Sequence, residues 1–122
     1  MQKLCIIFVL LGLMSCRSDK RAEGVLSRPQ LSELLVEVYV GEARVDQLRV
    51  GRDSAIRFFI PFEEKLLKSK GISDEVMKKT YEYYLAHPKE LEQVYDAVID
   101  TLALREQRLA KDARHRGVNV TP

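Results

Sequence analysis

The sequence contains few of the side chains that most often bind metals or attack substrates. It has two cysteines, two histidines and no tryptophan in 122 residues. His87 and His115 lie far apart, so they do not form the i, i+3 or i, i+4 histidine pair that metal sites on helices favour. We therefore expect no catalytic residue, no metal site and no bound cofactor in the folded part of the chain.

Neither sign of charge predominates. The chain has 20 Lys and Arg residues and 18 Asp and Glu residues, which gives a net charge of +2. Such a mixture is typical of a solvated surface, and it argues against an extended site for nucleic acid or another polyanion. The length corresponds to one small domain, and no internal repeat is visible.

Long apolar runs are absent except at the N-terminus. After Lys3, an uncharged segment covers residues 4–13, which is shorter than the roughly 20 residues that a membrane-spanning helix needs. A basic start, an apolar segment and small residues before Cys16 are typical of a cleaved export signal. We expect residues 1–15 to be this signal, and its loss would lower the net charge to +1 because Lys3 leaves with it.

The end of this segment, Leu13-Met14-Ser15-Cys16, resembles the lipobox of bacterial lipoproteins. The resemblance implies cleavage between Ser15 and Cys16, a diacylglyceryl group on the Cys16 sulfur and an N-acyl chain on the new amino group. A diacylglyceryl cysteine meets the two-chain condition for stable anchoring. The alternatives are a buried apolar helix and a Cys5–Cys16 disulfide, and the N-terminal position disfavours both. A lipidated Cys16 leaves the mature chain without a thiol.

The rest of the chain divides into a tether, a domain and a tail. Residues 16–28 are polar and lack periodicity, which predicts a flexible tether. Residues 29–116 carry helical patterns and form the expected domain. Residues 117–122 are expected to be a frayed tail.

Apolar residues at helical spacing predict two helices in the first half of the domain. One would run from Pro29 to about Val45. The second would be capped by Asp53 or Ser54, would be kinked or would begin anew at Pro61, and would stop at Gly71. The expected inward residues of these helices are Leu31, Leu34, Leu35, Val38, Ile56, Phe59, Ile60, Leu66 and Leu67.

Two further helices follow. Ser73 would cap the third, which would end before His87 because the residue preceding Pro88 avoids helical geometry. Pro88 would open the fourth, which would continue through Leu109 to about Arg114. The expected inward residues are Val76, Met77, Tyr81, Tyr84, Leu85, Leu91, Val94, Tyr95, Val98 and Leu102. No strand pattern competes, so the predicted fold is all-α, a small bundle of about four helices.

Aromatic residues and one histidine supply the candidates for an interaction surface, because aromatic side chains with polar tips are favoured at interfaces. The candidate residues are Phe58, Phe62, Tyr83, Tyr84 and His87. Packing into the core is the competing interpretation for the tyrosines. For His87, the competing interpretation is a residue that satisfies the last carbonyls of a helix. The paired carboxylates and the basic residues between 105 and 116 are interpreted as solvated charge.

Several short motifs together resemble a known family. They are the lipobox, a first helix opening at a proline, Lys68-Ser69-Lys70-Gly71-Ile72-Ser73 and Tyr83-Tyr84-Leu85-Ala86-His87-Pro88. The chain resembles, over most of residues 29–104, a family of short lipoproteins of Bacteroidota known as domain of unknown function 4296. The resemblance implies a cell-envelope setting and brings no catalytic residue with it.

A lipid anchor and a helical domain without reactive groups favour a non-catalytic interaction module. We expect an accessory or assembly subunit of a cell-envelope complex, held to the membrane by its lipid and bound to an envelope protein. The alternative is a periplasmic domain that binds a ligand or an unfolded client, as chaperones do. An enzyme would require His87 to meet acids in one pocket.

The residues after Cys16 bear on location. Arg17 occupies the position directly after Cys16. In some bacteria, an aspartate at this position retains lipoproteins in the inner membrane. Asp19 alone falls short of the acidic cluster that resembles a surface-export signal. We therefore expect the protein at the periplasmic face of the outer membrane.

Overall fold

The computed structural model describes residues 23–117. The predictions for the signal segment, for Ser15 and Cys16, and for residues 118–122 of the tail lie outside these described residues. The described chain forms four helices, α2 (Arg28–Gln47), α3 (Arg52–Ser69), α4 (Asp74–Ala86) and α5 (Pro88–His115), and it contains no strand. The predicted all-α fold is confirmed.

α2 begins earlier than Pro29, because a capping box precedes it. The Ser27 hydroxyl accepts a hydrogen bond from the Gln30 amide at 3.2 Å, and the Gln30 side chain accepts one from the Ser27 amide at 2.8 Å. Together they satisfy two amides at the helix start. Leu26, just before the cap, is only 8% exposed and belongs to the core. The ordered domain therefore includes residues that the sequence pattern assigned to the tether.

α3 differs from its prediction at its start and in its middle. Its N-cap is Gly51, which has no side chain to make a capping bond, so the prediction of Asp53 or Ser54 as the cap is wrong. Asp53 lies in the first turn, where its charge suits the helix dipole. The helix continues through Pro61 instead of beginning anew there. Proline therefore costs α3 one backbone hydrogen bond without ending it.

The predicted stop of α3 is confirmed. Gly71 adopts a φ of 65°, and its amide donates to the Lys68 carbonyl at 3.1 Å. The Ile72 amide donates to the Leu67 carbonyl at 3.0 Å. This pair of bonds is a Schellman motif, whose left-handed residue is usually glycine.

Both ends of α4 are also confirmed. The Ser73 hydroxyl accepts from the Val76 amide at 3.3 Å, and the acidic first turn suits the dipole. α4 ends at Ala86, and α5 opens at Pro88. His87 joins the two helices in a non-helical conformation, as expected of a residue before proline.

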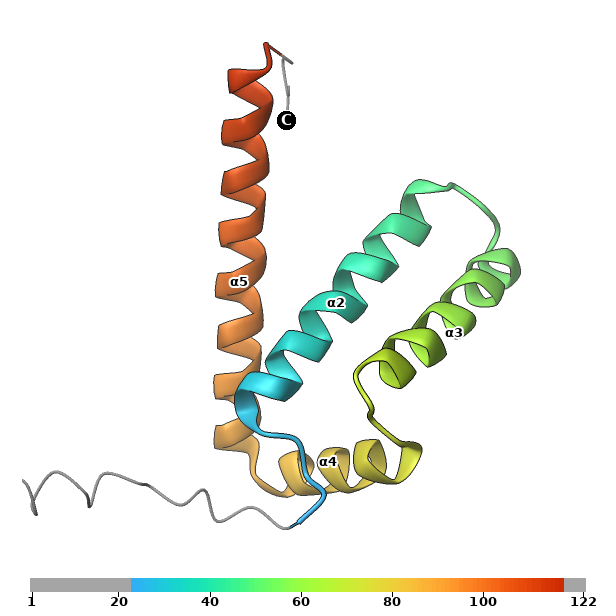
Figure 1. The fold of residues 1–122 in the computed structure, drawn as a ribbon, viewed down its shortest axis with the longest axis vertical. Coiled ribbons are helices and arrows are strands. Elements are labelled where there is room, and N and C mark those ends of the chain that lie inside the picture. The colour runs from blue at the N-terminus through green and yellow to red at the C-terminus, as the bar shows by residue number, and fades with distance from the viewer. Residues whose placement is uncertain (1–22, 118–122) are drawn as a thin grey trace, which may run out of the picture.

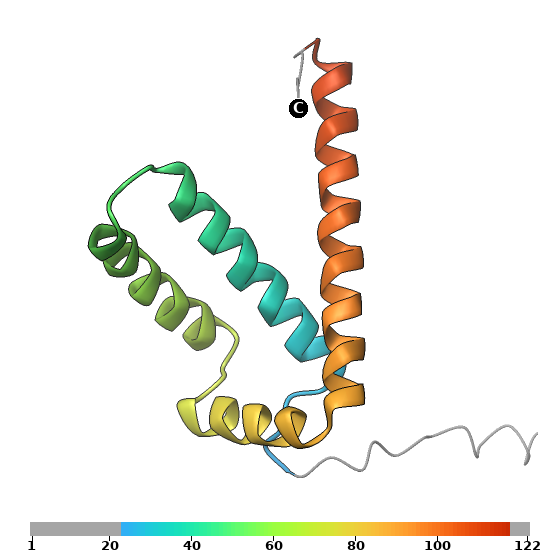
Figure 2. The ribbon, with the colours of Figure 1, turned by 180° about the vertical axis from the view of Figure 1, so that it is seen from behind.

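α2 is the central helix of the bundle. It packs against α5 on one side and against α3 on the other, while α4 crosses the lower end and packs on α5 (Figure 1, Figure 2). The core lies where α2, α4 and α5 meet. Its buried apolar residues are Leu26, Leu31, Leu34, Leu35, Val36, Tyr84, Val94 and Val98. This core confirms most of the predicted inward positions of α2 and two of those of α5.

α3 contributes no fully buried residue. Gly41 of α2 lets the Phe62 ring approach closely, since a Cβ added at Gly41 would lie 2.2 Å from Phe62 Cε1. Ile56 and Ile60, predicted to face inward, are 46% and 50% exposed because one neighbouring helix cannot cover them.

The inward face of α4 is rotated from its predicted position. Tyr81 and Leu85 are 50% and 73% exposed, whereas Thr80 is fully buried beside Tyr84. The prediction that Tyr81 and Leu85 face the core is wrong, as is that for Tyr95 of α5, which is 41% exposed. Thr80 can be buried although it is polar, because its hydroxyl accepts a hydrogen bond from the Leu26 amide.

The bundle is open at one end. α5 has 28 residues and α2 has 20, so α5 is longer by about 12 Å at the helical rise of 1.5 Å per residue. The two helices diverge from the α4 end, and the C-terminal half of α5 extends away from the others (Figure 1). Within residues 23–117, no helix is long and apolar enough to cross a bilayer.

Candidate functional site

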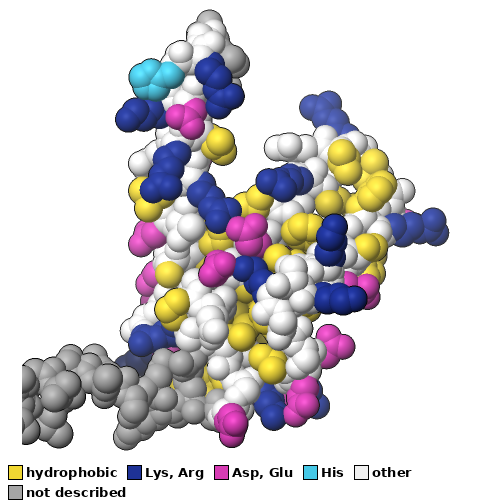
Figure 3. Space-filling view, in the orientation of Figure 1, with side chains coloured by type: hydrophobic (Ala, Val, Ile, Leu, Met, Phe, Trp, Pro, Cys, Tyr) yellow, Lys and Arg dark blue, Asp and Glu magenta, His cyan; other side chains and the backbone are white. Residues whose placement is uncertain are grey.

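The divergence of α2 and α5 creates a cleft of about 740 Å³. Its residues come from the C-terminal halves of both helices. They are Val40, Arg44, Leu102, Arg105, Glu106, Leu109, Ala110, Ala113 and Arg116. Figure 3 shows the cleft as a notch between the α5 column and the lobe formed by α2 and α3, with Lys and Arg side chains on both sides.

The floor of the cleft is apolar. Val40 and Leu102 are partly buried and pack against the core at its closed end. Towards the open end the wall is Leu109, which is 68% exposed, beside the small side chains of Ala110 and Ala113. An apolar surface that continues from the core and remains open to solvent is characteristic of a binding site for another molecule.

The rim of the cleft is basic, with three arginines and one glutamate. Arg105 donates to Glu37 of α2 at 2.9 Å, so its charge is largely neutralised. Arg44 and Arg116 make no ion pair within the part of the chain that the structure describes. The two unpaired guanidinium groups lie on opposite walls and leave the rim with a positive potential.

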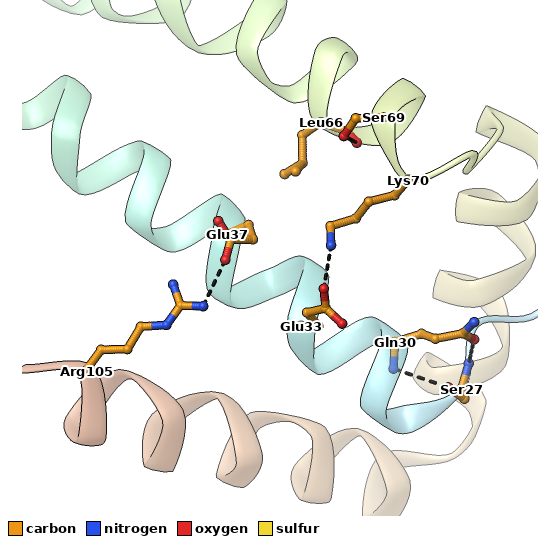
Figure 4. A network of polar contacts seen from close by, with 8 residues as sticks. All are labelled: Ser27, Gln30, Glu33, Glu37, Leu66, Ser69, Lys70 and Arg105. Atoms are coloured by element: carbon orange, nitrogen blue, oxygen red, sulfur yellow. Dashed lines mark hydrogen bonds and ion pairs between the residues drawn. The ribbon is translucent and has the colours of Figure 1, made fainter.

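Two ion pairs brace α2 against its neighbours (Figure 4). Glu37 pairs with Arg105 of α5, and Glu33 accepts from Lys70 at the end of α3 at 2.7 Å. The hydrogen bond and the charge of Lys70 lower the pKa of the Glu33 carboxyl. Exposed pairs contribute little to stability, and of these two only the Glu37–Arg105 pair joins α2 and α5, the two helices that form the cleft.

A buried polar contact holds the start of the domain. The Thr80 hydroxyl accepts from the Leu26 amide at 3.0 Å and donates to the Val76 carbonyl at 2.7 Å. The Tyr84 hydroxyl donates to the Leu26 carbonyl at 3.0 Å. We call these two side chains the Leu26 clamp. It satisfies both backbone groups of a residue that is buried outside any helix.

The predicted surface residues Tyr83, Tyr84 and His87 meet at the corner between α4 and α5. Tyr84 is 1% exposed, so it belongs to the core and not to a surface. The Tyr83 ring stacks on His87 with centroids 4.1 Å apart, and its hydroxyl donates to Glu90 at 3.0 Å. His87 Nδ1 lies 2.7 Å from the Tyr83 carbonyl. These contacts build the corner, in agreement with the helix-end interpretation of His87.

The two phenylalanines of the predicted surface lie on α3, away from that corner. Phe62 is half-buried against Gly41. Phe58 is 56% exposed, and Ile56 and Ile60 beside it in sequence are also exposed. The five candidates therefore do not form one surface. A smaller cavity of about 340 Å³ between the end of α2 and the start of α3 is lined in part by Ile56 and Phe59.

Three tyrosines outside the core belong to three different helices, Tyr39 of α2, Tyr81 of α4 and Tyr95 of α5. Burial raises the pKa of the Tyr39 hydroxyl, and the neighbouring Tyr95 raises it further. Burial and the charge of Glu63 raise the pKa of the Tyr81 hydroxyl. In residues 23–117, no three His, Cys, Asp or Glu side chains gather in a way that could hold a metal ion.

Sequence reasoning missed the cleft, although a signal for it was present. Leu102 and Leu109 are seven residues apart, and Ala113 continues the same stripe. The stripe extends beyond the length of α2, so its last part has no helix to cover it. The basic residues between 105 and 116 were interpreted as a solvated helix end, whereas two of them, Arg105 and Arg116, border an apolar floor.

Comparison with known proteins places the chain in a family. No curated protein and no solved structure matches it. One family model, described as a domain of unknown function (DUF4296), matches residues 23–108. This range begins just before Leu26 and covers α2, α3, α4 and most of α5, including the closed end of the cleft. The chain belongs to the DUF4296 family.

Proposed function

We propose that this protein is a lipid-anchored, non-catalytic interaction module of the cell envelope that binds a partner protein in the cleft between α2 and α5. It would act as an accessory or assembly subunit at the periplasmic face of the outer membrane. The lipobox-like Leu13-Met14-Ser15-Cys16 supports the anchor. The observation that carries the binding role is the cleft itself, an apolar floor open to solvent beneath a basic rim.

The position of the cleft supports this role. The Leu26 clamp fixes the start of the described chain beside α4, at the end opposite the C-terminus of α5 (Figure 1). The cleft residues of α5 begin at Leu102, roughly 20 Å along the helix from Pro88, and extend to Arg116 at roughly 40 Å. A lipid on Cys16 would thus attach the domain through its α4 end, which lies away from the open end of the cleft.

Co-purification with matched variants tests the proposal. Leu109 lines the cleft, whereas Leu104 is 52% exposed on the same helix and does not. The lipidated full-length chain, recovered from gently solubilised envelope, should retain a defined partner. Leu109→Glu should remove that partner and Leu104→Glu should keep it. Loss of the partner in both variants, or in neither, would contradict docking in the cleft.

Fractionation of the same cells tests the anchor. Cys16→Ser should move the protein out of the membrane fraction, because the domain itself has no membrane-spanning helix within residues 23–117. A Cys16→Ser chain that is processed normally and stays membrane-bound would contradict lipid anchoring.

A second candidate function is the binding of unfolded clients. It is favoured by the exposed apolar side chains Ile56, Phe58 and Ile60 of α3, and apolar side chains gather over the start of this helix (Figure 3). Suppression of aggregation of a model substrate, reduced by Phe58→Ser and unaffected by Leu109→Glu, would favour this function over docking in the cleft. The opposite pattern would exclude it.

A further inference from the structure

We propose that the occupant of the cleft is an amphipathic α-helix of the partner protein, with its apolar face on the cleft floor and acidic side chains towards Arg44 and Arg116. This inference rests on the proposed function and specifies the chemistry of the partner. It follows from the shape of the cleft, the spacing of its charges and the charge of the chain's own helices.

The shape of the cleft suits a helix. Its walls are two diverging helices, and their side chains offer the ridges and grooves through which helices pack on one another. The floor presents Leu102 and Leu109 seven residues apart, the spacing at which a docked helix places its own apolar anchors. The small side chains of Ala110 and Ala113 allow close approach at the open end.

The unpaired charges of the cleft lie on both of its walls. Arg44 stands on α2 and Arg116 at the C-cap of α5, while Arg105 on the α5 wall is engaged by Glu37. Acidic residues repeated along both edges of a docked helix would reach the arginines on both walls, so charge complementarity favours an acidic helix.

A second copy of this chain fits the cleft poorly. In a symmetric dimer through the cleft, each copy would present the same segment of α5, which carries Arg105, Arg108, Lys111, Arg114 and Arg116 against Glu106 and Asp112. Placing two such segments together sets like charges in contact, which opposes association. Glu33 and Glu37 of α2 are already paired with Lys70 and Arg105, and α2 packs against α5 and α3. A symmetric dimer through the cleft is therefore disfavoured, and we assign the occupant to a different protein.

Binding of designed helical peptides tests the inference. The probe is a fluorescent peptide of about 18 residues, five helical turns, with leucines on one face and glutamates along both edges. A matched peptide carries lysines in place of the glutamates, and a scrambled peptide has the same composition without the amphipathic pattern. Fluorescence anisotropy is measured with the lipidated full-length protein in zwitterionic lipid nanodiscs, and empty nanodiscs are the blank.

The glutamate peptide should bind about tenfold or more tightly than the lysine peptide, with an affinity that falls as salt is raised. Arg44→Glu combined with Arg116→Glu should reverse this preference. Arg108→Glu should leave it unchanged, because Arg108 lies on the same helix and does not line the cleft. Leu109→Glu should reduce binding of the glutamate peptide, and Leu104→Glu should not.

Each contrary result has a distinct meaning. Equal binding of both peptides, lost in Leu109→Glu, would refute the acidic preference while leaving docking in the cleft intact. Equal binding of the scrambled peptide would refute recognition of a helix. A partner that co-purifies through Leu109 while no helical peptide binds would refute the helical occupant alone. A dimer of the wild-type chain that Leu109→Glu dissociates would assign the cleft to a second copy and overturn the inference.

Discussion

Replacement of Thr80 by valine tests how the domain begins. Valine has nearly the same shape and a similar helix propensity, so the substitution removes one hydroxyl and little else. Thr80 is fully buried, and its hydroxyl is the acceptor for the Leu26 amide at 3.0 Å. Without it, a buried backbone donor loses its partner while the carbonyl of Leu26 remains bonded to Tyr84.

The expected loss follows from that single unsatisfied group. Leaving a buried donor unpaired costs about 1–3 kcal/mol of the free energy of unfolding. For a domain of this size, each kcal/mol lowers the melting temperature by about 4–8 °C. Thr101→Val is the matched control, because the Thr101 hydroxyl donates only to the Ala97 carbonyl of its own helix. That variant should change stability by less than about 0.5 kcal/mol.

Urea denaturation followed by circular dichroism measures both variants, and Tyr84→Phe completes a double-mutant cycle. Because both side chains hold Leu26, the loss in the double variant should be smaller than the sum of the single losses. Hydrogen exchange should show that the Leu26 amide is protected in the native protein and exposed in Thr80→Val. A Thr80→Val variant as stable as Thr101→Val, or an unprotected native Leu26 amide, would refute the Leu26 clamp.

Three further outcomes are expected. Gly41→Ala should lower the free energy of unfolding by roughly 1–2 kcal/mol, because the added methyl overlaps the Phe62 ring. This loss should outweigh the better helix propensity of alanine. Phe62→Leu in the same chain should recover part of the loss. Gly71→Ala should cost about 1 kcal/mol in the same denaturation assay, because an L side chain is disfavoured at a φ of 65°; no loss would contradict the Schellman geometry. Raising the pH above about 10 should reduce the free energy of unfolding. In the unfolded chain, tyrosine ionises near this pH. In the folded protein, the raised pKa values of Tyr39 and Tyr81 keep both hydroxyls neutral. The stability that these two hydroxyls contribute is therefore present below that pH and lost as the pH rises through their folded pKa values, and a flat profile between pH 9 and 11 would argue against it.

The helix ends that were predicted correctly depend on neighbouring residues alone. Ser73 caps α4 through an amide three residues away, and Gly71 ends α3 through bonds to the preceding turn. Pro88 restricts His87 by direct steric contact. Signals of this kind are complete within a few residues of sequence, so no tertiary information is needed to interpret them.

The missed features depend on contacts between distant segments. Leu26 is ordered because Thr80 and Tyr84, more than 50 residues later in the chain, bond its backbone. Val36 was not among the predicted inward residues of α2. It is buried because α5 and α3 cover that helix on two sides. α3 remains exposed although its pattern is amphipathic, since only α2 packs on it. Apolar spacing indicates which residues could be buried, but the number of covering helices decides which are.

The cleft was missed for the same reason. The apolar stripe through Leu102 and Leu109 is visible in the sequence, and the length of α5 was predicted almost fully. Its exposure follows from the angle between α2 and α5, which no local pattern specifies. The lipidation prediction at Cys16 concerns a residue outside the described chain, and it stays a prediction that fractionation of Cys16→Ser can test.

Site-specific photo-cross-linking in living cells tests the central claim most directly. A photoreactive amino acid is placed at Leu109 in the cleft or at Leu104 on the outer face of the same helix, and the covalent adducts are compared. Our account predicts a discrete adduct with one envelope protein from position 109, mapped to an acidic amphipathic helix of that protein. The adduct should be lost when Arg44 and Arg116 are both changed to glutamate. An adduct of equal yield from position 104, or none from position 109, would contradict the assignment of the cleft as the docking site.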